Sequence, residues 1–145
     1  MQRATRILAA VAVGLAVLGI AAVQAEDWGQ WRGPNRDGHV AGFETPKAWP
    51  QQLKRQWNVE VGTGHASPVV AGHSVFAFSR EGEREKVRAL ALADGSTLWS
   101  QDYAAPFQMS PYATPHGKGP KSTPLVAGDR LYTLGIGNIL TCWDT

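Results

Sequence analysis

One stretch of this sequence occurs twice, and this internal repeat limits the chain to folds built from stacked modules. The first copy runs from Ser67 to Phe76 and the second from Thr123 to Tyr132, 56 residues later. Each copy has a hydroxyl residue, a proline, a short apolar run, an Ala-Gly dipeptide with two polar residues, and a second apolar run. Glycine supplies the positive φ that a two-residue hairpin turn needs, so each copy is predicted to be a β-hairpin.

A second repeated feature follows each hairpin. Residues 89–99 are predicted to form a strand, a turn at Gly95 and a strand that carries Trp99, and residues 142–145 match the first four positions of this unit. Trp57 and Trp99 each precede a hairpin and lie 42 residues apart. Four strands per repeat of about 42 residues is the period of a β-propeller blade. We therefore predict an all-β fold, a partial β-propeller of about two four-stranded antiparallel blades; the alternative is a two-sheet sandwich with accidental similarity.

Residues 89–99 resemble the tryptophan-docking motif of pyrroloquinoline-quinone-type propeller repeats, Ala-x-Asp-x-x-Thr-Gly-x-x-x-Trp. Three positions match the motif, Ala89, Gly95 and Trp99, whereas Ala91 stands where the family prefers Asp and Asp94 where it prefers Thr. The partial second copy has Cys142 in place of Ala and keeps Asp144. Trp28 to Gly38 is similar to the N-terminal signature of exported bacterial quinoprotein-like propellers. The resemblance implies a ring of seven or eight blades, so we expect this chain to be an N-terminal piece of a longer protein.

The N-terminus has the pattern of a secretory signal peptide. Arg3 and Arg6 precede an apolar run of 17 residues, and Ala25 follows with the small residue Val23 two positions earlier, as at a cleavage site. We predict a signal peptide at 1–25, an N-terminal segment at 26–56 and incomplete propeller repeats at 57–145, in an exported protein that is periplasmic or secreted. The alternative is an uncleaved N-terminal anchor, since the run is slightly short of the ~20 residues of a membrane span.

Charge excludes one group of partners. Without the two leader arginines, 12 Lys and Arg residues face 12 Asp and Glu residues. A neutral chain offers no electrostatic attraction for DNA, RNA or an anionic membrane surface. We therefore expect no nucleic-acid partner and, after signal cleavage, no membrane span.

The candidate binding residues lie in two loops. His65 ends the glycine-rich stretch at 62–65, which lacks the Gly-Lys-Ser/Thr of a phosphate loop. The long connection at 103–121, rich in Pro and Gly, carries Tyr112, His116, Lys118 and Lys121. Long ordered loops are often functional, so these residues are predicted to form a loop face that binds a protein or small-molecule ligand. The alternatives are a flexible excursion and a structural histidine.

Three further features are predicted to be structural. The cluster at 28–38 should pack against the sheets with its tryptophan pair buried. Arg32 and Arg36 are free to pair with Asp37, and the alternative is that they clamp the carboxylate of a ligand. The mixed-charge run at 80–86 is predicted to be a solvated hairpin tip. Cys142 takes the small-residue position of the repeat and is predicted to be buried.

No reaction can be assigned from the residues. The four scattered histidines and single cysteine lack the spacing of a zinc site, and no nucleophile elbow is present. The favoured function is a non-catalytic exported scaffold with no assigned cofactor. The alternative is part of a quinone-dependent dehydrogenase, in which the resemblance implies pyrroloquinoline quinone and calcium, although this chain has no adjacent-cysteine pair. A sensor or accessory domain is the third possibility.

Overall fold

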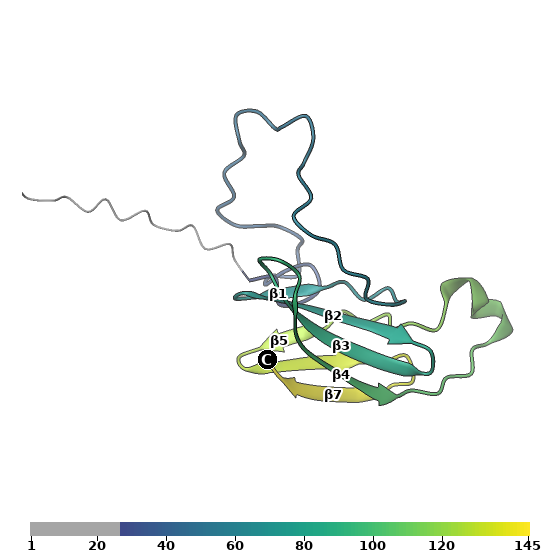
Figure 1. Ribbon diagram of the computed structural model, residues 1–145. Coiled ribbons are helices and arrows are strands. Elements are labelled where there is room, and N and C mark those ends of the chain that lie inside the picture. Colours follow the sequence, from purple (N-terminus) through teal and green to yellow (C-terminus); the bar gives the residue numbers. More distant parts are fainter. Residues whose placement is uncertain (1–26) are drawn as a thin grey trace, which may run out of the picture.

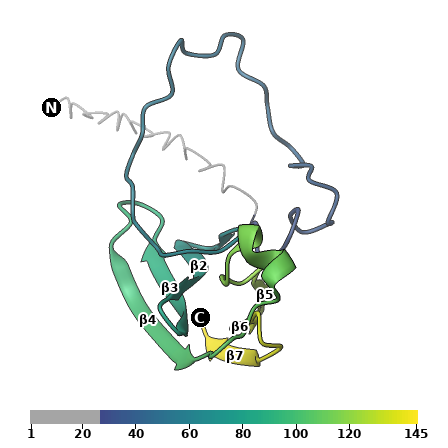
Figure 2. The same cartoon turned by 90° about the vertical axis from the view of Figure 1, so that its right-hand side faces the viewer.

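The computed structural model describes residues 27–145, which form two antiparallel β-sheets that lie face to face (Figures 1 and 2). The predicted signal peptide and its cleavage residue Ala25 lie outside the described residues. Sheet A has four strands in chain order: β1 (Val69–Ala71), β2 (Ser74–Glu81), β3 (Arg84–Ala91) and β4 (Thr97–Ala104). Sheet B has three: β5 (Leu125–Ala127), β6 (Arg130–Leu134) and β7 (Leu140–Asp144). One short 3₁₀ helix, η1 (Pro111–His116), lies in the connection between the sheets.

The two predicted hairpins are confirmed, and they have the same register. In β1–β2 Val69 pairs with Phe76, and in β5–β6 Leu125 pairs with Tyr132. Both turns contain a glycine in the left-handed region, Gly72 at φ 55° and Gly128 at φ 61°. The repeat in the sequence is therefore a repeat of backbone geometry.

The core lies between the two sheets. Sheet A contributes the fully buried side chains of β1, β2 and β3, and sheet B contributes Leu131 from β6: Val69, Phe76, Phe78, Val87, Ala89 and Leu131. At the outer strands Tyr103 of β4 stacks on Trp143 of β7, with ring centroids 6.3 Å apart. Each sheet alone would leave an apolar face in water, so the stacking of the sheets supplies the stability of the pair.

The N-terminal segment ties the innermost strands together. Trp28 exchanges two backbone hydrogen bonds with Val70 of β1, at 2.8 and 3.0 Å. The next carbonyl, of Gly29, accepts a 2.7 Å hydrogen bond from Val126 of β5. Residues 28 and 29 thus connect β1 and β5, which are distant from each other in the sequence. The predicted burial of the tryptophan pair is wrong for Trp31, which is 58% exposed, whereas Trp28 is half-buried.

Trp57 covers the face of sheet A that points away from sheet B. Its ring rests on the β3–β4 turn, where a Cβ on Gly95 would lie only 2.7 Å from the indole. The indole nitrogen donates a 2.9 Å hydrogen bond to the carbonyl of Leu92. Gly95 has a φ of 74°, so glycine is required there both for the turn and for the contact. Residues 39–56 of the N-terminal segment arch away from the sheets as a long loop (Figure 2).

Two details of the prediction need correction. The modules are not both four-stranded, because β7 pairs only with β6 within residues 27–145. The charged run at 80–86 is not a solvated tip throughout, since Arg80 is 3% exposed and Glu85 is fully buried. The two-residue turn at Gly82 and Glu83 is exposed as expected.

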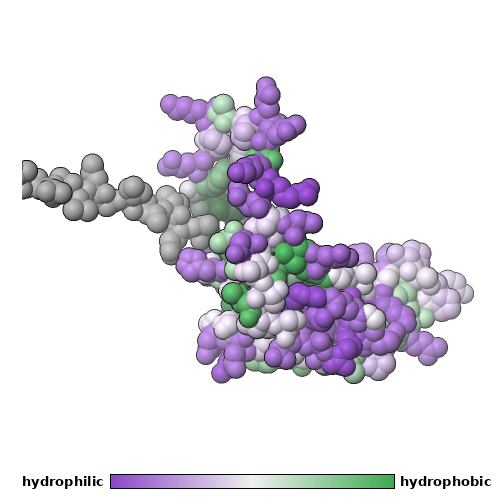
Figure 3. Space-filling model, viewed as in Figure 1, coloured by the Kyte–Doolittle hydropathy of each residue, from purple (hydrophilic) through white to green (hydrophobic). Residues whose placement is uncertain are grey.

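One face of the described part is mainly polar. Hydrophilic residues cover most of the face shown in Figure 3, and hydrophobic residues form small separate patches there. Within residues 27–145 no helix has the length and apolar character needed to cross a membrane.

Candidate functional site

The connection from β4 to β5 folds over the end of sheet A where β2 turns into β3 (Figure 1). At its start the Ala105 amide donates to the carbonyl of Glu83 at 2.9 Å. Near its end the carbonyl of Pro120 accepts hydrogen bonds from the His65 and Ala66 amides, at 2.8 and 3.2 Å. A Cβ on Gly119 would lie 2.5 Å from Gly64 Cα, so the two backbones are in direct contact. The connection is therefore held at its start against the β2–β3 turn and near its end against the predicted His65 loop.

Three of the predicted loop-face residues come together at this end. His65 Nε2 lies 3.0 Å from the carbonyl of His116, which can only accept, so this nitrogen carries the proton. Lys121 Nζ donates to the same carbonyl and, at 3.1 Å, to that of Gly117. Lys118 reaches the β2–β3 turn. Tyr112 lies apart on η1 with 95% of its surface exposed.

A buried arginine connects this loop to the sheet. Arg80 Nη2 donates to Glu83 Oε2 and to the carbonyl of Ala105, each at 2.8 Å, and Nε donates to the carbonyl of Gly82 at 2.8 Å. Lys118 Nζ lies 3.4 Å from the other oxygen of Glu83, and this hydrogen bond holds the pKa of the Glu83 carboxyl below its usual value. Arg80 thus fixes the shape of the turn on which the loop rests. A charge-balanced sequence run does not reveal this burial.

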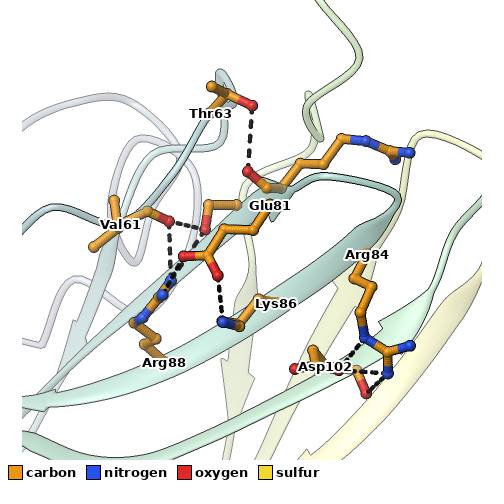
Figure 4. A network of polar contacts seen from close by, with 9 residues as sticks. Val61, Thr63, Glu81, Arg84, Lys86, Arg88 and Asp102 are labelled. Atoms are coloured by element: carbon orange, nitrogen blue, oxygen red, sulfur yellow. Dashed lines mark hydrogen bonds and ion pairs between the residues drawn. The ribbon is translucent and has the colours of Figure 1, made fainter.

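A second ion network lies on the outer face of sheet A (Figure 4). Glu81 accepts from Lys86 and Arg88, and these two hydrogen bonds lower the pKa of its carboxyl. Arg88 also donates to the carbonyl of Val61 at 2.9 Å. The segment before β1 is thereby attached to sheet A, and Thr63 completes the attachment by two backbone hydrogen bonds to Arg80, at 3.0 and 2.7 Å.

A buried carboxylate joins the two sheets. Glu85 of β3 accepts a 2.6 Å hydrogen bond from the Tyr103 hydroxyl and a 2.8 Å hydrogen bond from the amide of Ile136, in the turn after β6. Burial, together with the hydrogen bond to Glu85, raises the pKa of the Tyr103 phenol. A Cβ on Gly135 would overlap the carboxylate, so the turn approaches it as closely as backbone can. Glu85 is fully buried between the sheets, so its role is structural.

The N-terminal cluster differs from its predicted pairing. Arg32 Nη2 donates to the backbone carbonyl of Asp37 at 2.8 Å, and Arg36 Nε donates to the side chain of Gln30 at 3.0 Å. The Asp37 carboxylate instead accepts from the His39 amide at 2.9 Å. Among the described residues no guanidinium pairs with the Asp37 carboxylate, because short local turns satisfy each group first.

Cys142 is exposed, contrary to the prediction of a buried packing residue. It lies on the face of β7 that points away from sheet A, beside Tyr132, whose pKa is raised by a hydrogen bond to the thiol. The motif partner Ala89 is fully buried by sheet B, whereas nothing within the described residues covers Cys142. Between residues 27 and 145 no three His, Cys, Asp or Glu side chains lie close enough to hold a metal ion.

The residues at the motif positions of the first repeat lie in a strand–turn–strand unit. Ala89 pairs with Trp99 across β3 and β4, Gly95 forms the turn between them, and Trp57 packs on that turn. In the partial second copy, Asp144 forms an ion pair with its cross-strand neighbour Arg130 of β6. Comparison with known proteins identifies no relative: no protein-family profile matches the chain, and no curated protein matches it significantly.

Proposed function

We propose that this protein is an exported scaffold of quinoprotein-like β-propeller repeats, which holds a partner protein or ligand on the loop face at the β2–β3 end of sheet A. The repeat assignment is supported by the two hairpins in the same register and by the tryptophan that rests on the glycine turn of the next strand pair. The proposed export depends on the leader pattern of residues 1–25.

The observation that carries the binding proposal is the fixed position of the β4–β5 connection. Hydrogen bonds at both of its ends hold His116 beside His65 and Lys118 beside Glu83, above a turn that the buried Arg80 shapes. Binding residues placed on a loop that a rigid sheet positions lose little conformational freedom on binding. The Lys118 and Lys121 ammonium groups each keep at least one hydrogen beyond those used in the contacts above, so the preferred ligand groups are carboxylates and carbonyl oxygens.

Site-specific photocrosslinking in the exported protein tests this proposal. A photoreactive residue at His116, which is exposed on the loop beside His65, is expected to capture a defined partner. The matched control is the same residue at His73, in the exposed β1–β2 turn at the opposite end of sheet A, which should capture none. Equal capture at both positions would refute the loop face. Alcohol-dependent dye reduction after addition of pyrroloquinoline quinone and calcium would refute the non-catalytic role.

A further inference from the structure

The carboxylates at the β2–β3 end of sheet A are, with one exception, committed to partners within the sheets. Three of them are satisfied in this way and do not neutralise the loop face above: Glu81 pairs with Lys86 and Arg88, Asp102 with Arg84, and Glu85 with Tyr103 and the Ile136 amide. The exception is Glu83 in the β2–β3 turn, which contacts the loop face directly. The charge of the loop face therefore depends on this one carboxylate.

Arg80 lies beneath the start of the β4–β5 connection and has one nitrogen without a partner. The residue is 3% exposed, and its Nη1 is buried without a hydrogen-bond partner among the described residues. Nε and Nη2 donate to Glu83 and to the carbonyls of Gly82 and Ala105. Leaving a buried donor of a charged group unpaired is costly, so such a group calls for an explanation. Glu83 contacts the guanidinium through one oxygen only, so the protein neutralises the charge of Arg80 incompletely.

Two lysines add further positive charge to the loop face. Lys118 Nζ lies 3.4 Å from Glu83 Oε1, in an ion pair whose side chains are 43% and 61% exposed. Exposed pairs of this kind contribute little to stability, so Lys118 is held weakly. Lys121 donates to the carbonyls of His116 and Gly117 and forms no ion pair within residues 27–145. One carboxylate therefore serves three cations, the two lysines and the buried arginine.

We propose that the partner of the loop face presents an acidic segment of a protein, with neighbouring aspartate or glutamate side chains, and that Lys118 exchanges Glu83 for one of these carboxylates. Lys121 uses its remaining hydrogen for a second carboxylate, while Arg80 keeps Glu83 and remains as a fixed positive charge beneath. A surplus of positive charge selects anions over neutral carbonyl groups. This inference rests on the proposed function and narrows its ligand to one chemical class.

Two blocked peptides, tetraglutamate and tetraglutamine, test the charge requirement on the full chain. Titrations followed by amide chemical shifts at low salt should show tetraglutamate binding at least about tenfold more tightly, with the shifts concentrated at residues 116–121. The affinity should fall as salt is added, because the contacts are exposed ion pairs. Equal binding of the two peptides, or shifts away from the loop face, would overturn the proposal. Glutarate that binds as tightly as tetraglutamate would overturn the assignment to a protein segment.

Glu83→Gln distinguishes the proposed exchange from a purely structural ion pair. The substitution removes the carboxylate that competes for Lys118 and keeps an oxygen that can accept from Arg80. Tetraglutamate should therefore bind about threefold more tightly to this variant than to the parent. The Glu83 side chain is 61% exposed, so the variant is expected to fold, which its unfolding curve will check. Unchanged or weaker binding would overturn the exchange.

Two lysine variants and a matched control locate the site. Lys118→Gln and Lys121→Gln should each weaken tetraglutamate binding about fivefold. Arg84→Gln removes the same charge from the same end of sheet A, but from a cation that is paired with Asp102, and should change the affinity by less than about twofold. Equal losses for the three variants would overturn the assignment to the two lysines.

The crosslinking experiment at His116 separates this inference from the proposed function. Specific capture of a partner at His116, combined with equal binding of the two peptides, would refute the acidic partner and leave the loop face in place. Equal capture at His116 and His73 would refute the loop face itself, and with it this inference.

Discussion

Replacing Leu131 with alanine should strongly destabilise the protein, because this side chain links the two sheets. Leu131 is fully buried and packs in the core against residues of sheet A. The substitution removes three carbon atoms, which is about 2.4 kcal/mol of transfer free energy at about 0.8 kcal/mol each. The remaining cavity brings the expected loss to about 3 kcal/mol, within the usual range for buried leucines. The melting temperature should fall by roughly 10 °C.

Leu134 provides a matched control on the same strand. It lies three residues along β6 on the opposite face and is 40% exposed, so Leu134→Ala should cost about 1 kcal/mol or less. Urea denaturation of the full chain and its two variants measures both losses, and an unchanged m-value shows that the same surface is exposed on unfolding. Equal losses for the two variants would refute the stacking of the sheets on this face of β6.

Three further perturbations test separate parts of the structure. Gly95→Ala should lower the free energy of unfolding in denaturant by about 3 kcal/mol, because it combines a positive φ with a clash against Trp57. Gly72→Ala, with φ 55° and no atom within 4 Å of the new Cβ, should lower it by about 1 kcal/mol. Equal losses for the two variants would contradict the tryptophan contact. The raised pKa of Tyr103 means that the folded state holds the phenolic proton more tightly, so its stabilising contribution is complete below the ordinary pKa of 10.0 and is lost as the pH rises above it. Unfolding curves recorded from about pH 9 to 11 should show this loss in the parent and a smaller one in Tyr103→Phe, and identical slopes would exclude the effect. Cys142 should react with a thiol reagent in the folded chain as fast as in denaturant, and protection in the folded chain would show that its face of β7 is covered.

The hairpins could be predicted from the sequence because their signals are local. A glycine that must adopt positive φ, a proline before a short apolar run and a second apolar run define each hairpin within ten residues. The repetition of this pattern predicted two hairpins of the same kind, and the structure shows that they share one register, with Val69 paired to Phe76 and Leu125 paired to Tyr132. The turn at Gly95 was predictable for the same reason.

The burial of charged residues could not be predicted, since it depends on contacts between distant segments. Arg80 and Glu85 stand in a run that is typical of a solvated turn, and only the approach of Ala105 and of the turn at Ile136 covers them. Cys142 shows the opposite error. Its motif position predicted burial, but a residue on this face is buried only when another sheet packs on it. In the described residues sheet B packs on the equivalent face of sheet A, and no sheet packs on the Cys142 face of sheet B.

Of the candidate site, the sequence indicated the residues but not their arrangement. The length and composition of the β4–β5 connection marked His116 and Lys118 as candidates. The structure places His116 beside His65 and Lys118 beside Glu83 in the β2–β3 turn. Tyr112 shared the same sequence signal but lies apart from them. The deciding contact, between the backbones at Gly64 and Gly119, involves two glycines without a side-chain signal.

The central claim is that two sheets of the same build stack face to face, and the contact between their outer strands tests it most directly. Tyr103 of sheet A and Trp143 of sheet B have ring centroids 6.3 Å apart and planes inclined by 22°. Nuclear Overhauser spectroscopy of the folded chain should show cross-peaks between the protons of these two rings, and Tyr103→Leu should abolish them. Their absence from a chain whose β2–β3 and β6–β7 pairings are both intact would contradict the stacked arrangement.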